Sequence, residues 1–280
     1  SVNFRAQGGK VHALIGANGA GKSTLMKVLS GNYSNFSGDI LMNGEKISIA
    51  SPRDAQKQGI QIVPQEVDTA LIPYLSVGEN IMIHTTTVQR GMWMNWKSVH
   101  NKANELLNRL NINISSTKLV QDLTLAEKQM ILIARALTVD CKFLILDEPT
   151  APLSTTETNK LFEVVRKLQK DRVGIIFISH RLPEIFSLCD EITILRNGEL
   201  VEQEQIIKTT PNKVVEKMLG KKLEEQFPKR INVIGNNLLQ VKNLSDRNKL
   251  ANINMTVNKG EIVGIAGLVD RKSVVSGKSV

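Results

Sequence analysis

Hydrophobic and polar positions near the start of the chain alternate in patterns that predict three elements. Residues 11–15 form a short apolar run, typical of a buried strand, and residues 22–29 place apolar side chains at helical spacing. Residues 38–45 then alternate and turn at Asn43-Gly44, which favours a hairpin. We therefore predict a strand, an amphipathic helix and a hairpin, in that order.

The middle of the chain is mainly helical in its periodicity. Ser51 followed by Pro52 predicts the start of a short helix, and residues 60–63 return as a strand that ends at Gln65. Helical spacing then recurs in three stretches, residues 77–83, 99–110 and 125–137. This pattern predicts a helical subdomain, about residues 71–137, inserted between two halves of a parallel sheet.

Composition is that of an ordinary globular protein. The 280 residues are 41% hydrophobic, enough for one large domain or two smaller ones. There is no apolar run of about 18 residues and no secretory signal, so any membrane role would be peripheral. The net charge of +9 is spread without a dense basic tract and aromatics are only 4%, which favours a solvated surface or an acidic membrane face over nucleic-acid recognition.

Four side chains outside any motif allow simple interpretations. Cys141 and Cys189 lie far apart beside apolar segments, without metal-ligand spacing, so we predict free, buried thiols in a reducing cytoplasm. Trp93 and Trp96 are expected in the loop before the middle helix of the subdomain. There we favour local packing over a docking surface.

Residues 16–24 fit the phosphate-binding loop pattern G-x-x-x-x-G-K-[ST] between the predicted strand and helix. Glycines let the backbone form a nest of N–H donors, and the helix N-terminus adds its dipole. Lys22 would reach the β- and γ-phosphates, and the Ser23 hydroxyl would bind Mg²⁺. The predicted nucleotide-binding residues are Gly16, Ala17, Asn18, Gly19, Ala20, Gly21, Lys22, Ser23 and Thr24. A Gly-rich turn that only caps a helix is the alternative.

An acidic pair ends a second apolar run, residues 143–148. A parallel strand would deliver both carboxylates at its C-terminal edge. There Asp147 can hold Mg²⁺ through its water shell, and Glu148 can orient and polarise a water in line with the γ-phosphorus. The alternative is a solvated acidic turn. Residues 174–179 predict another buried strand ending in His180, to which we assign a γ-phosphate contact at the same edge.

Five ordered elements resemble an ABC-type ATPase cassette, over about residues 1–205. They are the phosphate loop, Gln65, the segment Leu123-Thr124-Leu125-Ala126-Glu127-Lys128-Gln129, the strand ending at Glu148, and His180. Four further matches are Val63-Pro64-Gln65-Glu66, Asp147-Glu148-Pro149-Thr150-Ala151-Pro152-Leu153-Ser154, Ile178-Ser179-His180-Arg181 and Met218-Leu219-Gly220-Lys221-Lys222-Leu223-Glu224. With these the chain most resembles the twin-cassette ATPases of bacterial ribose- and galactose-type sugar importers.

This resemblance implies an α/β fold of the P-loop NTPase type. Its parts would be a mostly parallel core sheet, an antiparallel β subdomain and the inserted helical subdomain. Two cassettes would face head to tail with ATP bound between them, so a single cassette should hydrolyse ATP poorly. The signature segment Thr124, Leu125, Ala126 and Glu127 would complete the partner's site. Ala126 stands where the family usually has Gly, so it keeps the N–H donor but allows a less close approach.

The resemblance also implies roles and partners. Gln65 would sense the γ-phosphate and the metal, and relay that state to the helical subdomain, which docks on membrane permease subunits. ATP hydrolysis with Mg²⁺ would power import of a simple sugar, peripherally at the cytoplasmic face of the bacterial cell membrane. A periplasmic or lipoprotein sugar-binding protein would be an indirect partner, and the second cassette would lie in the same chain or in a dimer.

Two other functional classes stay open. A soluble nucleotide switch acting on ribosomes or DNA is favoured by the positive charge and disfavoured by the missing basic arm. No nucleic acid is therefore expected as a partner. A catalytically silent binding module is the other alternative.

The domain organisation follows from the same pattern. Residues 1–205 would be the first cassette, residues 206–233 a connecting helix and linker, and residues 234–269 the start of a second cassette, in which residues 260–267 weakly repeat residues 9–16. Residues 270–280 resemble translated sequencing adapter, and we interpret them as a non-native tail. Lys272 stands where a second phosphate loop needs its first Gly.

The first residues suggest a truncated N-terminus. The chain starts without Met inside what should be a strand, residues 1–4. The adenine-stacking aromatic that such cassettes place before the loop strand would then be missing. We therefore expect weak nucleotide affinity for these 280 residues.

Overall fold

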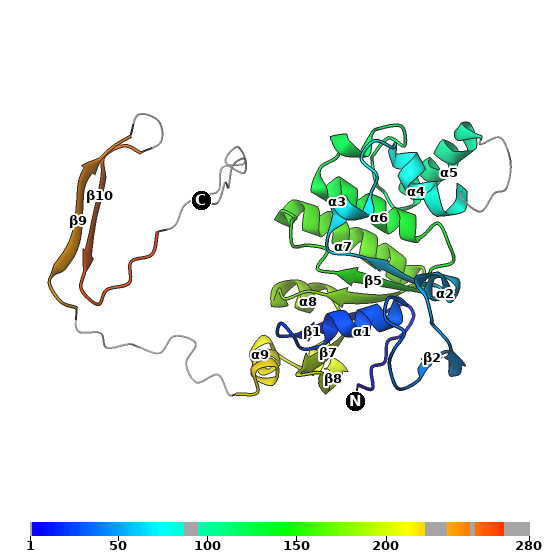
Figure 1. Ribbon diagram of the computed structural model, residues 1–280, viewed down its shortest axis with the longest axis horizontal. Coiled ribbons are helices and arrows are strands. Elements are labelled where there is room, and N and C mark those ends of the chain that lie inside the picture. The colour runs from blue at the N-terminus through cyan, green and yellow to red at the C-terminus, as the bar shows by residue number, and fades with distance from the viewer. Residues whose placement is uncertain (1, 87–94, 222–233, 247–249, 266–280) are drawn as a thin grey trace. The chain divides into compact units, whose positions relative to one another are not determined.

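The computed structural model (Figure 1) describes residues 2–86, 95–221, 234–246 and 250–265. The chain divides into two compact units, Ser1–Leu223 and Glu224–Val280, and each is considered by itself. Within the described ranges, none of the helices has both the length and the apolar character that a membrane crossing requires.

The first unit is built on a six-stranded sheet with the order β4-β5-β6-β1-β7-β8. Its strands are β1 (Val11–Gly16), β4 (Ile60–Val63), β5 (Phe143–Asp147), β6 (Gly174–Ile178), β7 (Glu191–Arg196) and β8 (Glu199–Gln205). Neighbours pair in parallel from β4 to β7, and β8 pairs antiparallel with β7. The prediction of a mostly parallel core sheet is confirmed.

Both faces of this sheet are covered, which explains the continuous apolar runs of its strands. Because side chains alternate along a strand, Val11, Ala13 and Ile15 of β1 enter one core while Leu14 enters the other. The first core includes buried residues of α6 (Leu125–Ala136), α7 (Thr155–Lys170) and α8 (Leu182–Leu188). The second includes residues of α1 (Lys22–Leu29) and α2 (Pro52–Lys57).

Helix starts follow local capping chemistry. The Ser51 side chain accepts a hydrogen bond from the backbone N–H of Asp54, and Pro52 opens α2, as predicted. Thr124 and Glu127 form a reciprocal capping box at the start of α6. The remaining helices are α3 (Val67–Ala70), α4 (Val77–Thr86), α5 (Trp96–Arg109), α9 (Pro211–Leu219) and the 3₁₀ turns Val120–Asp122 and Ile206–Lys208.

Helices α3 to α6 form the inserted helical subdomain. They follow β4 and precede β5, although these strands are neighbours in the sheet, and Figure 1 shows them at the end of the unit opposite β8. Trp96 is the first residue of α5 rather than part of a loop, because the Asn95 side chain caps the helix by accepting from Ser98 N–H. Trp93 lies outside the described residues.

The first unit also contains a separate antiparallel hairpin, β2 (Ile40–Met42) and β3 (Glu45–Ile47). Asn43 and Gly44 both have positive φ, 53° and 85°, as a tight hairpin turn requires. The strand predicted at residues 1–4 is wrong for residues 2–4. Both backbone groups of the following residue, Arg5, bond the Gln203 side chain amide, and no strand ladder forms.

The connecting segment begins with α9, which contacts β7 and β8. Lys217 of α9 pairs with Glu204 of β8 at 2.9 Å. Of the predicted connecting helix and linker, residues 206–233, the part from 222 to 233 lies outside the described residues.

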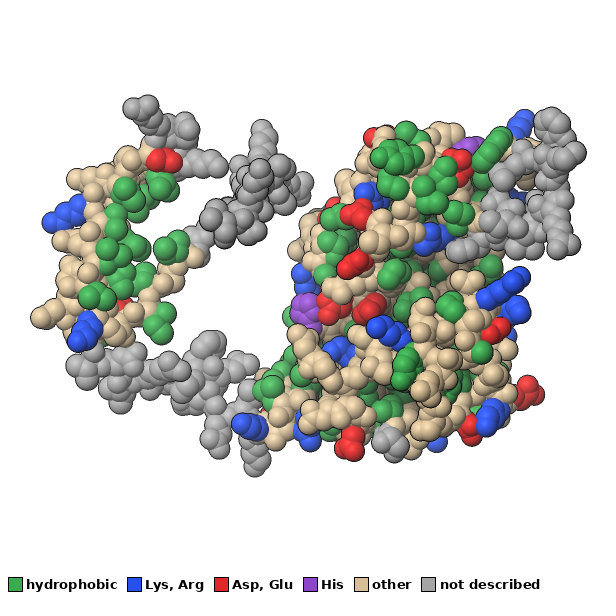
Figure 2. All heavy atoms as spheres, in the orientation of Figure 1, with side chains coloured by type: hydrophobic (Ala, Val, Ile, Leu, Met, Phe, Trp, Pro, Cys, Tyr) green, Lys and Arg blue, Asp and Glu red, His purple; other side chains and the backbone are tan. Residues whose placement is uncertain are grey.

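The second unit contains an antiparallel hairpin, β9 (Asn237–Leu244) and β10 (Ile253–Asn258). Figure 2 shows hydrophobic side chains gathered over this hairpin, and Leu238 is 74% exposed. Residues 261–265, the described part of the repeat of β1, form no strand. In the first unit β1 is held between β6 and β7, and the described part of the second unit supplies no such pair. Residues 270–280 lie outside the described residues, so the predicted boundaries here stay predictions.

The two cysteines are both free, as predicted. Cys189 is buried and Cys141 is half-buried. Burial raises the pKa of the Cys141 thiol to about 12, so it stays protonated at neutral pH.

Candidate nucleotide site

The predicted phosphate loop is one continuous turn between β1 and α1. β1 ends at Gly16 and α1 begins at Lys22, so the nine predicted residues span the end of the strand, the turn and the first helical turn. Gly21, at φ 100°, precedes the helix in a left-handed conformation that suits Gly. A Cβ on Gly16 would lie 2.4 Å from the Leu195 carbonyl oxygen, so only Gly fits where the loop passes β7.

Lys22 links the loop to the acidic pair. Its Nζ donates to the carbonyl oxygens of Gly16, at 2.7 Å, and Ala17, at 3.1 Å. Burial lowers the pKa of Lys22, while the charges of Glu148 and Asp147 act in the opposite direction. The ammonium group and both carboxylates therefore lie at the same edge of the sheet, where the parallel strands β1 and β5 both end.

The acidic pair stands at the end of β5. Burial raises the pKa of Asp147, the Glu148 charge adds to this, and Lys22 opposes it. Glu148 has a left-handed backbone, φ 46°, and its N–H donates to the Ile178 carbonyl oxygen at 3.0 Å. This conformation costs a non-Gly residue about 1 kcal/mol or more, and it turns the chain away from the strand direction directly after Asp147.

Glu148 contacts the other two predicted catalytic side chains, Gln65 and His180. Gln65 Nε2 donates to Glu148 Oε2 at 3.2 Å, and His180 Nδ1 lies 3.2 Å from Glu148 Oε1. Gln65 follows β4 and His180 follows β6, the strands on either side of β5. The His180 side chain is 65% exposed, so the group opens towards solvent, where a substrate could enter.

The signature segment lies elsewhere, at the N-terminus of α6. Thr124 and Leu125 are exposed, whereas Ala126 is buried. Glu127 accepts from Thr124 N–H at 2.8 Å and from Lys118 Nζ at 3.4 Å. Over the described residues, no hydrogen bond or ion pair joins this segment to the phosphate loop.

The residues at the loop fit a magnesium ion held together with phosphate. Ser23 is exposed beside the loop, and the Asp147 carboxylate supplies a second hard oxygen donor. No group of three or more His, Cys, Asp or Glu that could hold a metal is present among the described residues. Mg²⁺ is commonly held by one or two protein ligands, with substrate phosphates and water completing its shell. Two protein oxygens at this position match that pattern.

A hollow of about 790 Å³ lies beside the phosphate loop. Gly19, Gly21 and Thr24 form one side of it. Apolar side chains of the β2 strand, such as Ile40 and Met42, form another.

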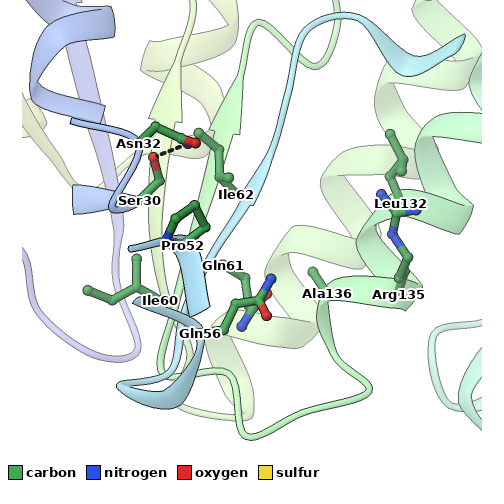
Figure 3. Close-up of a pocket in the computed structure, with 10 residues that line it drawn as sticks. All are labelled: Ser30, Asn32, Pro52, Gln56, Ile60, Gln61, Ile62, Leu132, Arg135 and Ala136. Atoms are coloured by element: carbon green, nitrogen blue, oxygen red, sulfur yellow. Dashed lines mark hydrogen bonds between the residues drawn. The ribbon is translucent and has the colours of Figure 1, made fainter. Parts of the chain in front are cut away.

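A smaller cavity, about 130 Å³, lies between α6 and the edge strand β4 (Figure 3). Gln56 and Gln61 lie on one side of it and Arg135 of α6 on the other. The Gln61 Nε2 atom is buried and has no hydrogen-bond partner among the described protein atoms. Sequence reasoning missed this cavity, because its lining comes from separate elements and no motif marks it.

Comparisons with known proteins concern the family and the fold. The profile of the family described as ABC transporter matches residues 1–151. The chain is 40% identical over 269 residues to the ribose import ATP-binding protein RbsA of Caldanaerobacter subterraneus subsp. tengcongensis. That alignment covers 96% of this chain and 54% of the relative, so the chain spans about half the length of the curated relative.

Solved structures share the fold. CbiO1 from Clostridium perfringens, part of the ABC transporter complex cbiONQ, is 27% identical with a TM-score of 0.65, covering 78% of this chain and 86% of that one. The ADP form of the cassette MJ1267 is 23% identical with a TM-score of 0.66, covering 78% and 91%. The dimeric cassette MJ0796 bound to ADP and Pi is 23% identical with a TM-score of 0.62, covering 73% and 89%.

The family match covers more than half of the chain and contains the whole phosphate loop and the acidic pair. The sheet and the inserted helices have the arrangement of the solved cassettes. The chain therefore belongs to the ABC transporter family, and its first unit has the fold of an ABC ATP-binding cassette.

Proposed function

We propose that this chain binds ATP with Mg²⁺ at the phosphate loop and hydrolyses it. The observation that carries this proposal is the contact of both Glu148 oxygens, one with Gln65 and one with His180, at the edge where Lys22 also lies. A carboxylate held in this way can accept a proton from an attacking water.

Each remaining side chain has a role that fits its position. The loop N–H groups and Lys22 would hold the phosphates, and Ser23 and Asp147 would hold Mg²⁺, which would supply positive charge against the phosphate oxygens. Glu148 would take the proton of the water, and His180 would contact the γ-phosphate. Since phosphoryl transfer depends mainly on positioning and charge, these side chains would supply one cassette's part of the chemistry.

Two contacts support a relay from Gln65 to the helical subdomain. Lys128 Nζ of α6 pairs with Asp68 of α3 at 2.6 Å. Arg135 Nη1 donates to the Ala70 carbonyl oxygen at 2.7 Å. The segment directly after Gln65 is therefore tied to α6, so a shift of Gln65 would move α6 as well. We propose that α6 passes this movement to a permease docked on the subdomain.

A second cassette would complete the site. The dimeric structure of MJ0796 gives a precedent for paired cassettes. The exposed Thr124 and Leu125 are free to face a partner's phosphate loop. We propose this pairing with a second cassette in the same polypeptide or in a second copy.

The proposed cargo is a simple sugar. Its support is the 40% identity with a ribose import ATP-binding protein. The protein would act at the cytoplasmic face of the cell membrane with permease subunits, and indirectly with a sugar-binding protein. The alternative function, a soluble nucleotide switch acting on ribosomes or DNA, has no support comparable to this sequence identity.

The test is a cell in which the natural gene carries Glu148→Gln. We expect the full-length variant to retain ATP but to lose hydrolysis, and uptake of radiolabelled ribose, galactose or another monosaccharide to stop. Hydrolysis at the wild-type rate would refute the role of Glu148. Normal uptake of all tested sugars, with hydrolysis lost, would refute transport. Salt-sensitive RNA or DNA binding by the purified protein would favour the switch instead.

A further inference from the structure

One mostly buried carboxylate, that of Glu184 on α8, joins the two loops that carry Glu148 and His180. Its side chain is 11% exposed. Glu184 Oε2 accepts from the Thr150 hydroxyl at 2.6 Å and from the Ser179 hydroxyl at 3.0 Å. Thr150 lies two residues after Glu148, and Ser179 lies directly before His180. A single carboxylate oxygen, Glu184 Oε2, therefore joins the loop that follows Glu148 to the loop that carries His180.

Arg181 strengthens the same connection from the other side of His180. Its Nη1 donates to Glu184 Oε1 at 3.1 Å and to the Thr150 carbonyl oxygen at 3.3 Å. Its Nη2 donates to the Ala151 carbonyl oxygen at 3.3 Å, and its backbone N–H donates to the Ser179 hydroxyl at 3.0 Å. His180 is thus flanked by two residues that both contact Glu184.

This cluster differs in exposure from the side chains that it supports. Thr150 and Ser179 are 1% and 4% exposed, whereas the His180 side chain is 65% exposed. Hydrogen bonds to a charged group are strong when they are shielded from water. The bonds of Glu184 with the buried Thr150 and Ser179 hydroxyls can therefore hold their geometry while the exposed His180 side chain meets substrate and water.

We propose that Glu184 is a positioning residue that sets the distance between Glu148 and His180. The two side chains lie 3.2 Å apart, and each loop is fixed to the Glu184 carboxylate within three residues of the reacting group. Loss of this tie would let the loops move independently, so that water and γ-phosphate are no longer aligned. This inference rests on the hydrolysis proposed above.

Glu184→Gln tests the proposal in the full-length protein. The new amide oxygen can still accept from Thr150 and Ser179, but its NH₂ group would face the guanidinium of Arg181, donor against donor. We expect kcat for ATP hydrolysis to fall about 10- to 100-fold, while KM and ATP binding change less than about threefold. The matched control is Glu79→Gln, since Glu79 accepts from Ser76 N–H at 2.7 Å in the helical subdomain. It should leave kcat unchanged.

A second pair of variants covers the case in which Glu184→Gln does not fold. Thr150→Val removes the hydroxyl that contacts Glu184 and keeps the shape, and Thr150→Ser keeps the hydroxyl. We expect the first to lower kcat and the second to retain it. Equal kcat in both would overturn the proposal.

A double-mutant cycle separates positioning from a general structural effect. If Glu184 acts through His180, then adding Glu184→Gln to His180→Ala should lower kcat no further. A full additional loss would overturn the inference. If Glu148→Gln does not hydrolyse ATP but Glu184→Gln has the same kcat as Glu79→Gln, the inference about Glu184 alone fails. If Glu148→Gln hydrolyses ATP as fast as wild type, the proposed function fails.

Discussion

Gln65 Nε2 donates to Glu148 Oε2 over 3.2 Å, although 83 positions separate the two residues along the chain. The contact exists because β4 and β5 are parallel neighbours whose C-terminal ends meet at one edge. Gln65, where the proposed relay to the helical subdomain begins, is therefore in contact with Glu148, the proposed general base.

Removal of this contact should slow hydrolysis. In Gln65→Ala, Glu148 loses the amide that holds one of its oxygens, so we expect kcat to fall about tenfold or more with little change in ATP binding. Steady-state kinetics of the full-length protein measure this. The control is Gln169→Ala, which removes a similar amide-to-carboxylate bond, to Asp190 at 2.8 Å, away from the site. Equal kcat values for the two variants would contradict the role of Gln65.

Asp147→Asn should make the nucleotide-free protein more stable while abolishing hydrolysis. Burial raises the pKa of Asp147, so the ionised carboxylate costs stability at neutral pH. Removing the charge should raise the free energy of unfolding at pH 7, by an amount that solvent screening of the half-buried carboxylate keeps small.

The pH dependence gives the check on Asp147. A raised folded pKa means that the cost is present above that pKa and disappears as the pH falls through it towards the ordinary 3.8. The advantage of Asp147→Asn in denaturant unfolding should therefore shrink with decreasing pH. A variant less stable than wild type at pH 7 would show that the attraction to Lys22 outweighs the cost of burial.

His12 should make the first unit sensitive to mild acid. It is fully buried, its Nε2 lies 2.7 Å from Thr193 Oγ1, and burial lowers its pKa to about 4 against the opposing charge of Glu191. Between the ordinary 6.5 and about 4, the unfolded chain binds a proton that the folded one does not, so stability falls as the pH falls.

The test is His12→Gln, which has no such titration. From pH 7.5 to pH 5, wild type should lose about 2 kcal/mol of unfolding free energy more than the variant. Titration of the carboxyl groups that do not contact His12 is common to both proteins and cancels in the difference, whereas Glu191, 3.3 Å from His12, belongs to the measured effect. Parallel pH profiles would mean that His12 titrates alike in the folded and unfolded states.

Ala126→Gly should strengthen the contact of the signature segment with a partner's site. Ala126 is the second residue of α6, behind the cap Thr124, and its methyl group limits how closely the backbone N–H can approach a phosphate. We expect ATP-driven pairing of cassettes at lower ATP concentration, with a loss of about 0.5–1 kcal/mol in stability. Sedimentation in a Glu148→Gln background measures the pairing. If the variant and the parent pair at the same ATP concentration, the contact that limits pairing does not involve Ala126.

The sequence by itself predicted many of the elements and the candidate site residues. The phosphate loop, the capped helices and the apolar strands follow from local rules, since spacing, capping side chains and turn residues act within a few positions. The family resemblance and the mostly parallel sheet were predicted from these and are confirmed.

Only the tertiary structure decided how distant residues meet. Strand order brought Gln65, Glu148 and His180 together, and it revealed Glu184 as the carboxylate that joins two loops. Sequence reasoning also misjudged residues 2–4, because a strand needs a neighbouring backbone as its partner, and the Arg5 backbone bonds the Gln203 side chain instead. Local patterns fix what each segment can become, whereas contacts between segments depend on the packing of the whole unit.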